Sequence, residues 1–448
     1  MWFFRKKGPS AKEWISLGTG FDLDKPDEII ENLGFHEGNR KGHFWCFGTT
    51  RVGKTRTMES IVEQDIRKGN SVIVIDPKGD IPLFSKIAQV AYETNRLCDL
   101  MLFSTIFPQM SVRLNPLSSY YMIEELVGHI TAGVDDGRDP FFKNVALNVS
   151  SVVVRALILQ AKVGNRPARF NFNDIKNLIS RSALEDLAAD IKANKTEEAV
   201  QLMKDIGKIL GHPADYYSKI ANSLSVALDE LTTSNIGQVI GNADRDPLIE
   251  RLEQGRGVIL VIHLGSLLSR RAGYTVGKTI LSTIQALVGR KFASGMSMTP
   301  PLSIHIDEAQ SVLYGGIEEL FAKAGGGGVY MQGYCQSINQ LYDAVGQNKA
   351  KSILDNCNTK LFMRVPDADT ATYISNHLGE RKIYSPILSL GGGCAIRETT
   401  DVRVLATDVL NLKPRQFFMI TYSGNYRGYT KDVANPNWNV IFPRIENS

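Results

Sequence analysis

The sequence is poor in cysteine, and no two cysteines have the Cys-x-x-Cys spacing of a metal site. A closely spaced, even-numbered set would be expected for a zinc site or a disulfide framework. The cysteines are odd in number and scattered over 448 residues: Cys46, Cys98, Cys335, Cys357 and Cys394. They indicate small buried thiols in a reducing compartment, and the seven histidines add no metal-ligand spacing.

Long uncharged hydrophobic runs are also missing. The most apolar stretch, residues 149–161, contains Arg155 and is shorter than the roughly 20 residues that a bilayer-spanning helix needs. At the N-terminus, Met1–Lys7 places aromatic residues directly before a basic cluster, as at the cytoplasmic edge of a membrane anchor. A frayed tail is the alternative interpretation of this segment.

Neither sign of charge dominates, since 51 Lys and Arg face 47 Asp and Glu and leave a net charge of +4. This excess is too small to indicate nucleic-acid binding by itself, so DNA would need a local patch or a ring channel. The 43% hydrophobic and 22% charged residues are ordinary globular values. They exclude a disordered, collagen-like or coiled-coil chain as the main architecture.

What the sequence does contain is an alternation of strand and helix patterns. Residues 43–47 form an apolar run, residues 57–68 have helical spacing, and residues 71–75 are continuously apolar and β-branched. A strand, a helix and a second strand in this order predict a parallel sheet. Similar strand-like runs return after residue 257, with one of them ending at Ile306.

Between these two halves the strand-like runs disappear and helical periodicity takes over. We therefore predict an all-α inserted domain at 121–247, which interrupts a nucleotide-binding domain made of residues 41–120 and 248–448. Residues 1–40 form a mixed lead-in, which is membrane-proximal if Met1–Lys7 marks a membrane edge.

A phosphate-binding loop (P-loop) is predicted between the first strand and the first helix. The match to G-x-x-x-x-G-K-[ST] consists of Gly48, Thr49, Thr50, Arg51, Val52, Gly53, Lys54 and Thr55. The glycines allow backbone N–H groups to wrap a phosphate, while Lys54 reaches the β- and γ-phosphates and Thr55 ligates Mg²⁺. A second Gly-Lys-Thr, at 277–279, has no preceding strand and is predicted to lie inside a helix.

An acidic pair follows the strand that ends at Ile306. A P-loop enzyme needs a carboxylate here to hold Mg²⁺ through water, which is Asp307, and a base for the attacking water, which is Glu308. Gln336, after the strand at 329–334, is a candidate sensor of the γ-phosphate; a solvated Gln that caps a helix is the other interpretation. His305 is expected to be a packed core histidine. The late position of the acid strand is typical of RecA-like motor cores.

Taken together, these motifs resemble the type IV coupling proteins, the TraD/TraG family of conjugation ATPases. The residues that carry the resemblance are 48–55, Asp76-Pro77-Lys78-Gly79-Asp80, Leu114-Asn115-Pro116-Leu117, 306–310 and Gln336-Ser337. The segment from Lys323 to Val365 is similar to the SXT/TOL-type TraD branch. The predicted fold class is α/β: a RecA-like P-loop NTPase core with a mainly parallel sheet, interrupted by an all-α inserted domain.

The resemblance implies an ATP- and Mg-dependent homo-hexamer that moves single-stranded DNA without sequence preference. It also implies that the chain delivers relaxase-bound DNA to a type IV secretion channel during conjugation, from the cytoplasmic side of the bacterial inner membrane. Family members usually begin with transmembrane helices, which this sequence does not show.

The resemblance further implies a cation supplied in trans by a neighbouring subunit. The family often has Arg at the position of Ala322, so the candidates here are Lys323, one residue later, and Arg364, at the end of the next predicted strand. Lys323 is favoured by position and Arg364 by chemistry. The alternatives are a solvated helix end for Lys323 and an ion pair with Asp367 or Asp369 for Arg364.

Two other functions are compatible with these motifs. One is a motor of the HerA/FtsK group that acts on double-stranded DNA. The other is an adaptor that uses ATP binding as a switch and recruits protein substrates to a secretion channel.

Overall fold

The computed structural model describes residues 13–134, 140–388 and 394–445. The predicted membrane edge at Met1–Lys7 therefore lies outside the described residues. The chain divides into two compact units. The first, called the P-loop unit below, takes the residues up to 68 together with 305–310 and 330–435; the second unit takes 69–304, 311–329 and 436–448.

The sheet of the P-loop unit combines parallel and antiparallel strands. Its strands run in the order β2 (Lys25–His36), β1 (Trp14–Asp22), β13 (Gly424–Thr430), β12 (Gln416–Thr421), β9 (Thr359–Phe362), β3 (Phe44–Phe47) and β8 (Val329–Cys335). β3 is parallel to both β8 and β9, whereas β12, β13, β1 and β2 are added antiparallel. The last two residues of β7 (Leu302–Ile306) also belong to this unit.

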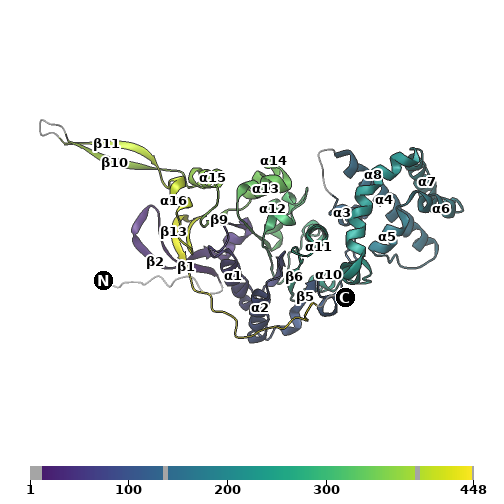
Figure 1. Cartoon of the computed structure of the whole chain (residues 1–448), viewed down its shortest axis with the longest axis horizontal. Coiled ribbons are helices and arrows are strands. Elements are labelled where there is room, and N and C mark those ends of the chain that lie inside the picture. Colours follow the sequence, from purple (N-terminus) through teal and green to yellow (C-terminus); the bar gives the residue numbers. More distant parts are fainter. Residues whose placement is uncertain (1–12, 135–139, 389–393, 446–448) are drawn as a thin grey trace. The chain divides into compact units, whose positions relative to one another are not determined.

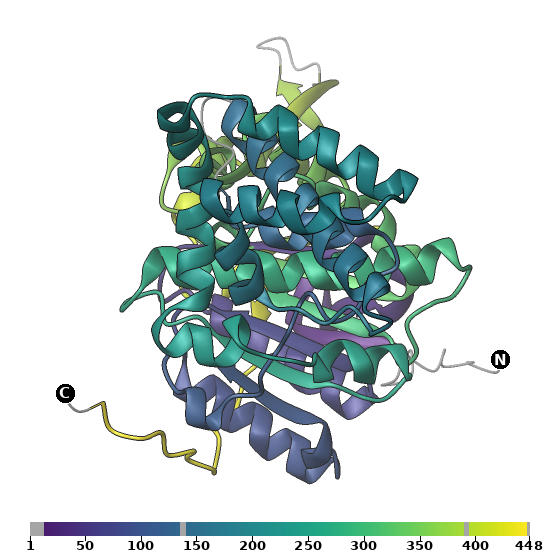
Figure 2. The same cartoon turned by 90° about the vertical axis from the view of Figure 1, so that its right-hand side faces the viewer.

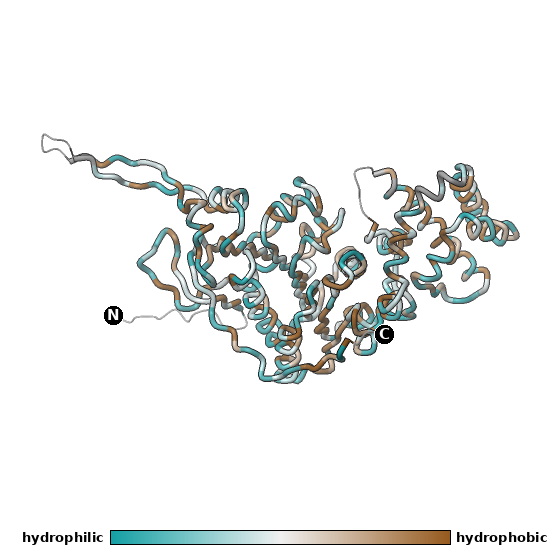
Figure 3. Tube along the Cα trace, in the orientation of Figure 1, coloured by the Kyte–Doolittle hydropathy of each residue, from teal (hydrophilic) through white to brown (hydrophobic). Residues whose placement is uncertain are grey.

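Helices and a hairpin complete the P-loop unit. They are α1 (Lys54–Lys68), the short turn η1 (Glu37–Gly42), α13 (Ile338–Val345), α14 (Gln347–Asp355), α15 (Ala368–Leu378), α16 (Ala406–Leu410), β10 (Glu380–Leu388) and β11 (Cys394–Val402). β10 and β11 pair with each other and project from the rest of this unit as a long hairpin (Figure 1). Hydrophobic and hydrophilic segments alternate along the hairpin (Figure 3), and Lys382 pairs with Glu398 across it.

The second unit contains a small parallel sheet of its own. β4 (Ser71–Asp76) and β5 (Leu100–Ser104) each pair in parallel with β6 (Ile259–His263). Every residue of β4 and β6 is buried, which explains their continuously apolar sequences. Helices of this unit that adjoin the strands in sequence are α2 (Ile81–Glu93), α10 (Pro247–Glu253), α11 (Arg270–Ala293) and α12 (Glu318–Lys323). The Gly-Lys-Thr at 277–279 lies inside α11, as predicted.

The described residues between 121 and 246 contain helices and no strand. They form α3 (Ile123–Thr131), α4 (Pro140–Val163), α5 (Phe172–Leu178), α6 (Arg181–Lys192), α7 (Glu197–Leu210), α8 (Ala214–Thr232) and α9 (Ser234–Ile236), followed by a π-helical turn at Gly237–Gly241. Figure 2 shows the teal helices of this segment gathered in one bundle. These residues share the second unit with β4, β5 and β6. The boundaries 41–120, 121–247 and 248–448 stay a prediction.

α4 is longer than its most apolar sequence stretch indicated. Within the described residues, Lys143–Val163 is long and apolar enough to cross a membrane, by length and composition alone. Residues 149–161 are thus part of a longer helix, which by length and composition alone could cross a bilayer. Half of the most apolar window is buried inside the protein, as is common for the core helix of a bundle.

Candidate active site

The predicted P-loop lies between β3 and α1, at the carboxyl end of the parallel strands. Its backbone is held by neighbouring segments of the same unit: the Gly48 N–H donates to the Cys335 carbonyl at 3.1 Å and the Thr49 N–H to the Arg364 carbonyl at 2.7 Å. On the other side of the loop, the Val52 carbonyl accepts a hydrogen bond of 2.8 Å from the Arg415 N–H. The ends of β8 and β9 and the turn before β12 therefore fix the loop.

The two glycines of the motif meet steric requirements of this loop. A Cβ atom at Gly48 would lie 3.0 Å from the side chains of both Val52 and Met363, closer than such contacts normally are. Gly53 has a φ of 115°, which side chains disfavour. Arg51 also has a positive φ, of 62°. This tight backbone turns the loop into the first turn of α1.

Lys54 begins α1 and is only 7% exposed. In the described part of the chain no carboxylate pairs with its ammonium group, and the first turn of α1 contains no acidic residue. A helix N-terminus has unsatisfied N–H groups and a partial positive charge, so this end of α1 attracts an anion. The loop, Lys54 and the half-buried Thr55 therefore fit a nucleotide phosphate with its Mg²⁺.

The acidic pair stands directly after β7, within the P-loop unit. Asp307 is 4% exposed, and one of its carboxylate oxygens accepts a hydrogen bond of 3.0 Å from the Glu308 N–H. Glu308 has a φ of 46°, a left-handed conformation that is uncommon for a residue with a side chain. Such strained conformations cluster at active sites, where the surrounding structure holds them in place.

Gln336 lies against Glu308, so the structure brings these two predicted site residues together. The Gln336 side-chain amide donates to Oε1 of Glu308 at 3.3 Å, and the Gln310 amide donates to Oε2 at 2.8 Å. Sequence reasoning did not select Gln310. Its position two residues after the acidic pair is the signal that could have found it.

The two candidates for a trans-acting cation have different surroundings. Arg364 is exposed, and its carbonyl already bonds to Thr49 of the same chain; no ion pair with Asp367 or Asp369 occurs among the described residues. These two aspartates instead accept hydrogen bonds from the Thr370 N–H and the Asn339 amide. Lys323 belongs to the second unit, where it pairs with Glu319 one helical turn earlier.

Arg415 is a further basic residue at the P-loop that sequence reasoning missed. Its guanidinium lies 4.5 Å from the centre of the Tyr429 ring and 2.5 Å from an oxygen of Asp432. Its Cγ would lie 3.9 Å from a Cβ atom at Gly53. No local motif surrounds Arg415, because its closeness to the loop depends on the pairing of β12 and β13.

The thiols of Cys46 and Cys335, near the site, are buried. Burial raises the pKa of Cys335 to about 12 and that of Cys46 well above its ordinary value. Cys357 is buried too, whereas Cys98 is exposed, contrary to the expectation of a buried thiol there.

Comparisons with known proteins show what this chain resembles. Residues 301–393 match the family model described as the TraM recognition site of TraD and TraG. The type 4 coupling protein DotL of Legionella pneumophila subsp. pneumophila (strain Philadelphia 1) is 25% identical over 200 residues, which cover 42% of this chain and 25% of DotL. The resemblance to the type IV coupling proteins is confirmed.

Solved structures of a coupling protein share the fold. The unbound conjugative coupling protein TrwBdeltaN70 superimposes with a TM-score of 0.71 over 97% of this chain and 91% of its own, at 14% identity. A complex of TrwB with ADP and Mg²⁺ matches with a TM-score of 0.64 at 15% identity, covering 90% and 89% of the two chains. The predicted α/β fold class with a RecA-like P-loop core is therefore confirmed. The match to DotL spans about a quarter of the length of that protein.

Proposed function

We propose that this chain is a Mg²⁺-dependent ATPase that works as the motor of a conjugative coupling protein. The observation that carries the proposal is the buried Lys54 at the start of α1 in the same unit as the Asp307–Glu308 pair. Lys54 contacts the phosphates, and Thr55 and Asp307 hold the metal, which offsets phosphate charge. Glu308 accepts the proton of the attacking water, and Gln336 senses the γ-phosphate through its contact with Glu308.

The proposal extends to the substrate and the assembly. The chain forms a homo-hexamer that moves single-stranded DNA, bound to a relaxase, toward a type IV secretion channel at the bacterial inner membrane. Support comes from the coupling-protein matches and from a family model whose description names a recognition site. Sequence-independent contacts to the DNA backbone make the affinity strongly dependent on salt.

The decisive experiment compares the wild-type protein with Glu308→Gln. The variant should bind ATP with wild-type affinity, because the phosphate contacts are kept. Its turnover should fall by about 10²–10⁴-fold, the usual contribution of a general base. Turnover near the wild-type rate would show that Glu308 is not the base.

The nucleic-acid substrate is tested by adding DNA at saturation to the same assay. Stimulation by single-stranded DNA supports the proposal, and stimulation by double-stranded DNA alone would favour a HerA/FtsK-like motor. ATP binding without stimulation by either would favour the adaptor function.

Lys323 is the proposed trans-acting cation, because it lies close before β8, the strand that leads into Gln336. Mixing Lys54→Ala and Lys323→Ala subunits should partly restore hydrolysis, since some interfaces then combine an intact loop with an intact lysine. Restoration by Arg364→Ala instead would move the role to Arg364.

A further inference from the structure

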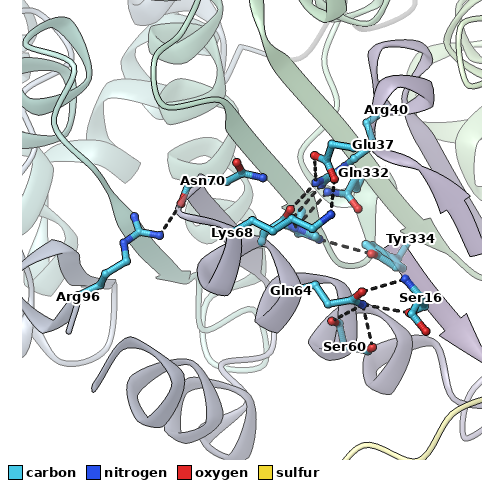
Figure 4. A network of polar contacts seen from close by, with 12 residues as sticks. Ser16, Glu37, Arg40, Ser60, Gln64, Lys68, Asn70, Arg96, Gln332 and Tyr334 are labelled. Carbon is cyan, nitrogen blue, oxygen red and sulfur yellow. Dashed lines mark hydrogen bonds and ion pairs between the residues drawn. The ribbon is translucent and has the colours of Figure 1, made fainter. Parts of the chain in front are cut away.

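A buried network of polar side chains within the P-loop unit includes Arg40, Gln332 and Tyr334, which Figure 4 labels. Its centre is Asp65 in α1, which is fully buried and accepts two hydrogen bonds from the Arg40 guanidinium, the longer of them 2.8 Å. The second partner is His305 in β7, whose Nε2 lies 3.0 Å from an Asp65 oxygen. The side-chain amide of Gln332 in β8 lies 3.0 Å from the same nitrogen.

The protonation of this network follows from its partners. Burial alone would raise the pKa of Asp65, but Arg40 and His305 hold it well below its ordinary value, so Asp65 is ionised. A carboxylate only accepts hydrogen bonds, hence Nε2 of His305 carries a proton, donates a hydrogen bond to Asp65 and accepts none from Gln332. Nδ1 of His305 then faces the Tyr334 hydroxyl at 3.4 Å.

Stability alone is a poor reason for such a network. Buried ion pairs are costly to desolvate, and apolar side chains of similar volume often replace them without loss of stability. Unlike an apolar cluster, the network makes directional contacts that constrain how the elements are oriented. Its hydrogen bonds allow one arrangement of α1, β7 and β8 relative to one another.

These three elements carry the catalytic side chains of the proposed ATPase. α1 begins with Lys54 and Thr55, β7 leads into Asp307 and Glu308, and β8 leads into Gln336. His305 is two residues from Asp307, about 7 Å along the strand, whereas Asp65 is about 15 Å along α1 from Thr55. A shift of β7 against α1 would therefore move the carboxylates away from the phosphate and its metal.

We propose that Asp65 and His305 are positioning residues that lock the acid strand β7 to the P-loop helix α1. This inference rests on the proposed function, since it concerns the residues assigned there to metal and water. The lock holds Asp307 at the distance from Thr55 at which both can share one Mg²⁺. The lock does not contribute to phosphate binding, which depends on the P-loop itself.

The test uses two substitutions at His305 and a matched control on α1. His305→Leu removes the donor to Asp65 and leaves the Arg40–Asp65 pair, while His305→Gln keeps an amide donor. The control is Gln64→Met, because Gln64 exchanges hydrogen bonds of 2.8 and 3.0 Å with the Ser16 backbone in β1 and has no hydrogen bond to β7. Fluorescent ADP is titrated with and without Mg²⁺, and hydrogen exchange of the peptide 303–310 is followed without nucleotide.

In His305→Leu, ADP affinity without Mg²⁺ should stay within about twofold of the wild type, because the P-loop is unchanged. The gain in affinity from Mg²⁺ should fall, and exchange of 303–310 should accelerate, each by about tenfold or more, as expected for a lost hydrogen bond to a charged group. His305→Gln should recover most of both effects. Gln64→Met should behave as the wild type.

A folded His305→Leu variant with wild-type Mg²⁺ dependence and exchange would overturn the proposal, as would equal changes in Gln64→Met. If His305→Leu fails to fold, the apolar triple variant Arg40→Met, Asp65→Leu, His305→Leu replaces it and must lose the same Mg²⁺ gain. Retention of that gain would refute the lock. If the wild type binds no ADP, the proposed function fails, and hydrogen exchange alone then decides on the lock.

Discussion

Two strand–turn–helix segments of this chain have the same topology and opposite chemistry. In the P-loop unit, β3 leads through the P-loop into α1; in the second unit, β4 leads through Pro77-Lys78-Gly79 into α2. Both strands are buried, both turns contain a glycine with positive φ, and both turns contain or end in a lysine. On topology alone, either helix N-terminus could bind an anion.

The segment after β4 satisfies its own backbone with carboxylates. Asp76 is 1% exposed, and its two oxygens accept hydrogen bonds from the N–H groups of Lys78 at 2.9 Å and Asp80 at 2.5 Å. The Asp80 side chain then caps α2 by accepting from the Leu83 N–H at 3.3 Å. Two carboxylates thus already accept hydrogen bonds from N–H groups of this turn and of the first turn of α2.

The P-loop has no such internal anion. Among the described residues, no side chain accepts a hydrogen bond from the N–H groups at the start of α1, and Lys54 has no carboxylate partner. An open helix N-terminus with a buried cation, rather than the turn itself, therefore distinguishes the proposed phosphate site. Two matched pairs of substitutions and one single substitution test whether the two segments differ in this way.

The largest effect is expected from the two lysines. Lys54→Ala should weaken ATP binding by about 2–5 kcal/mol and abolish hydrolysis, because the phosphate charge loses its direct partner. Lys78→Ala should leave ATP affinity unchanged. Calorimetric titration of both variants measures this, and similar losses in the two would show that the segments are not distinguished in this way.

A smaller effect is expected from the two glycines. Gly53→Ala places a side chain at a φ of 115° and should weaken nucleotide binding by about 1–3 kcal/mol through backbone strain in the loop. Gly79→Ala, at a φ of 78°, should lower the free energy of unfolding by about 1–2 kcal/mol without changing nucleotide affinity. Denaturant unfolding and ATP titration measure the two effects separately. Weaker ATP binding in Gly79→Ala, with unchanged ATP binding in Gly53→Ala, would contradict the comparison.

The smallest effect is expected from the cap of α2. Asp80→Ala removes the acceptor for the Leu83 N–H and should lower the free energy of unfolding by about 0.5–2 kcal/mol. ATP affinity should not change, since the role of the Asp80 side chain is to cap α2. Urea unfolding checks the first part; any large change in ATP affinity would speak against the assignment.

Features encoded within a few residues could be predicted from the sequence. The P-loop between a strand and a helix, the acid strand before Asp307, and the helical pattern from 121 to 247 each depend on local spacing. The sequence predicts the helix after the P-loop at 57–68, whereas α1 begins at Lys54. The difference arises because glycine and threonine obscure the first turn in the sequence pattern.

Features that depend on distant pairing could not be predicted. The sequence pattern predicts only a mixed lead-in where β1 and β2 lie. In the structure, β1 pairs with β13, about four hundred residues later. The partners Arg40, Asp65, His305 and Gln332 are equally scattered, so their network follows only from the order of the strands. His305 is buried, as expected, but its hydrogen bonds to Asp65 were not foreseen.

The most direct test of the account is an experimental structure of the protein with ADP and Mg²⁺. We expect the β-phosphate within hydrogen-bond distance of the P-loop N–H groups and Lys54, with the metal between Thr55 and Asp307. Nucleotide bound elsewhere, or a metal that faces neither Thr55 nor Asp307, would contradict it.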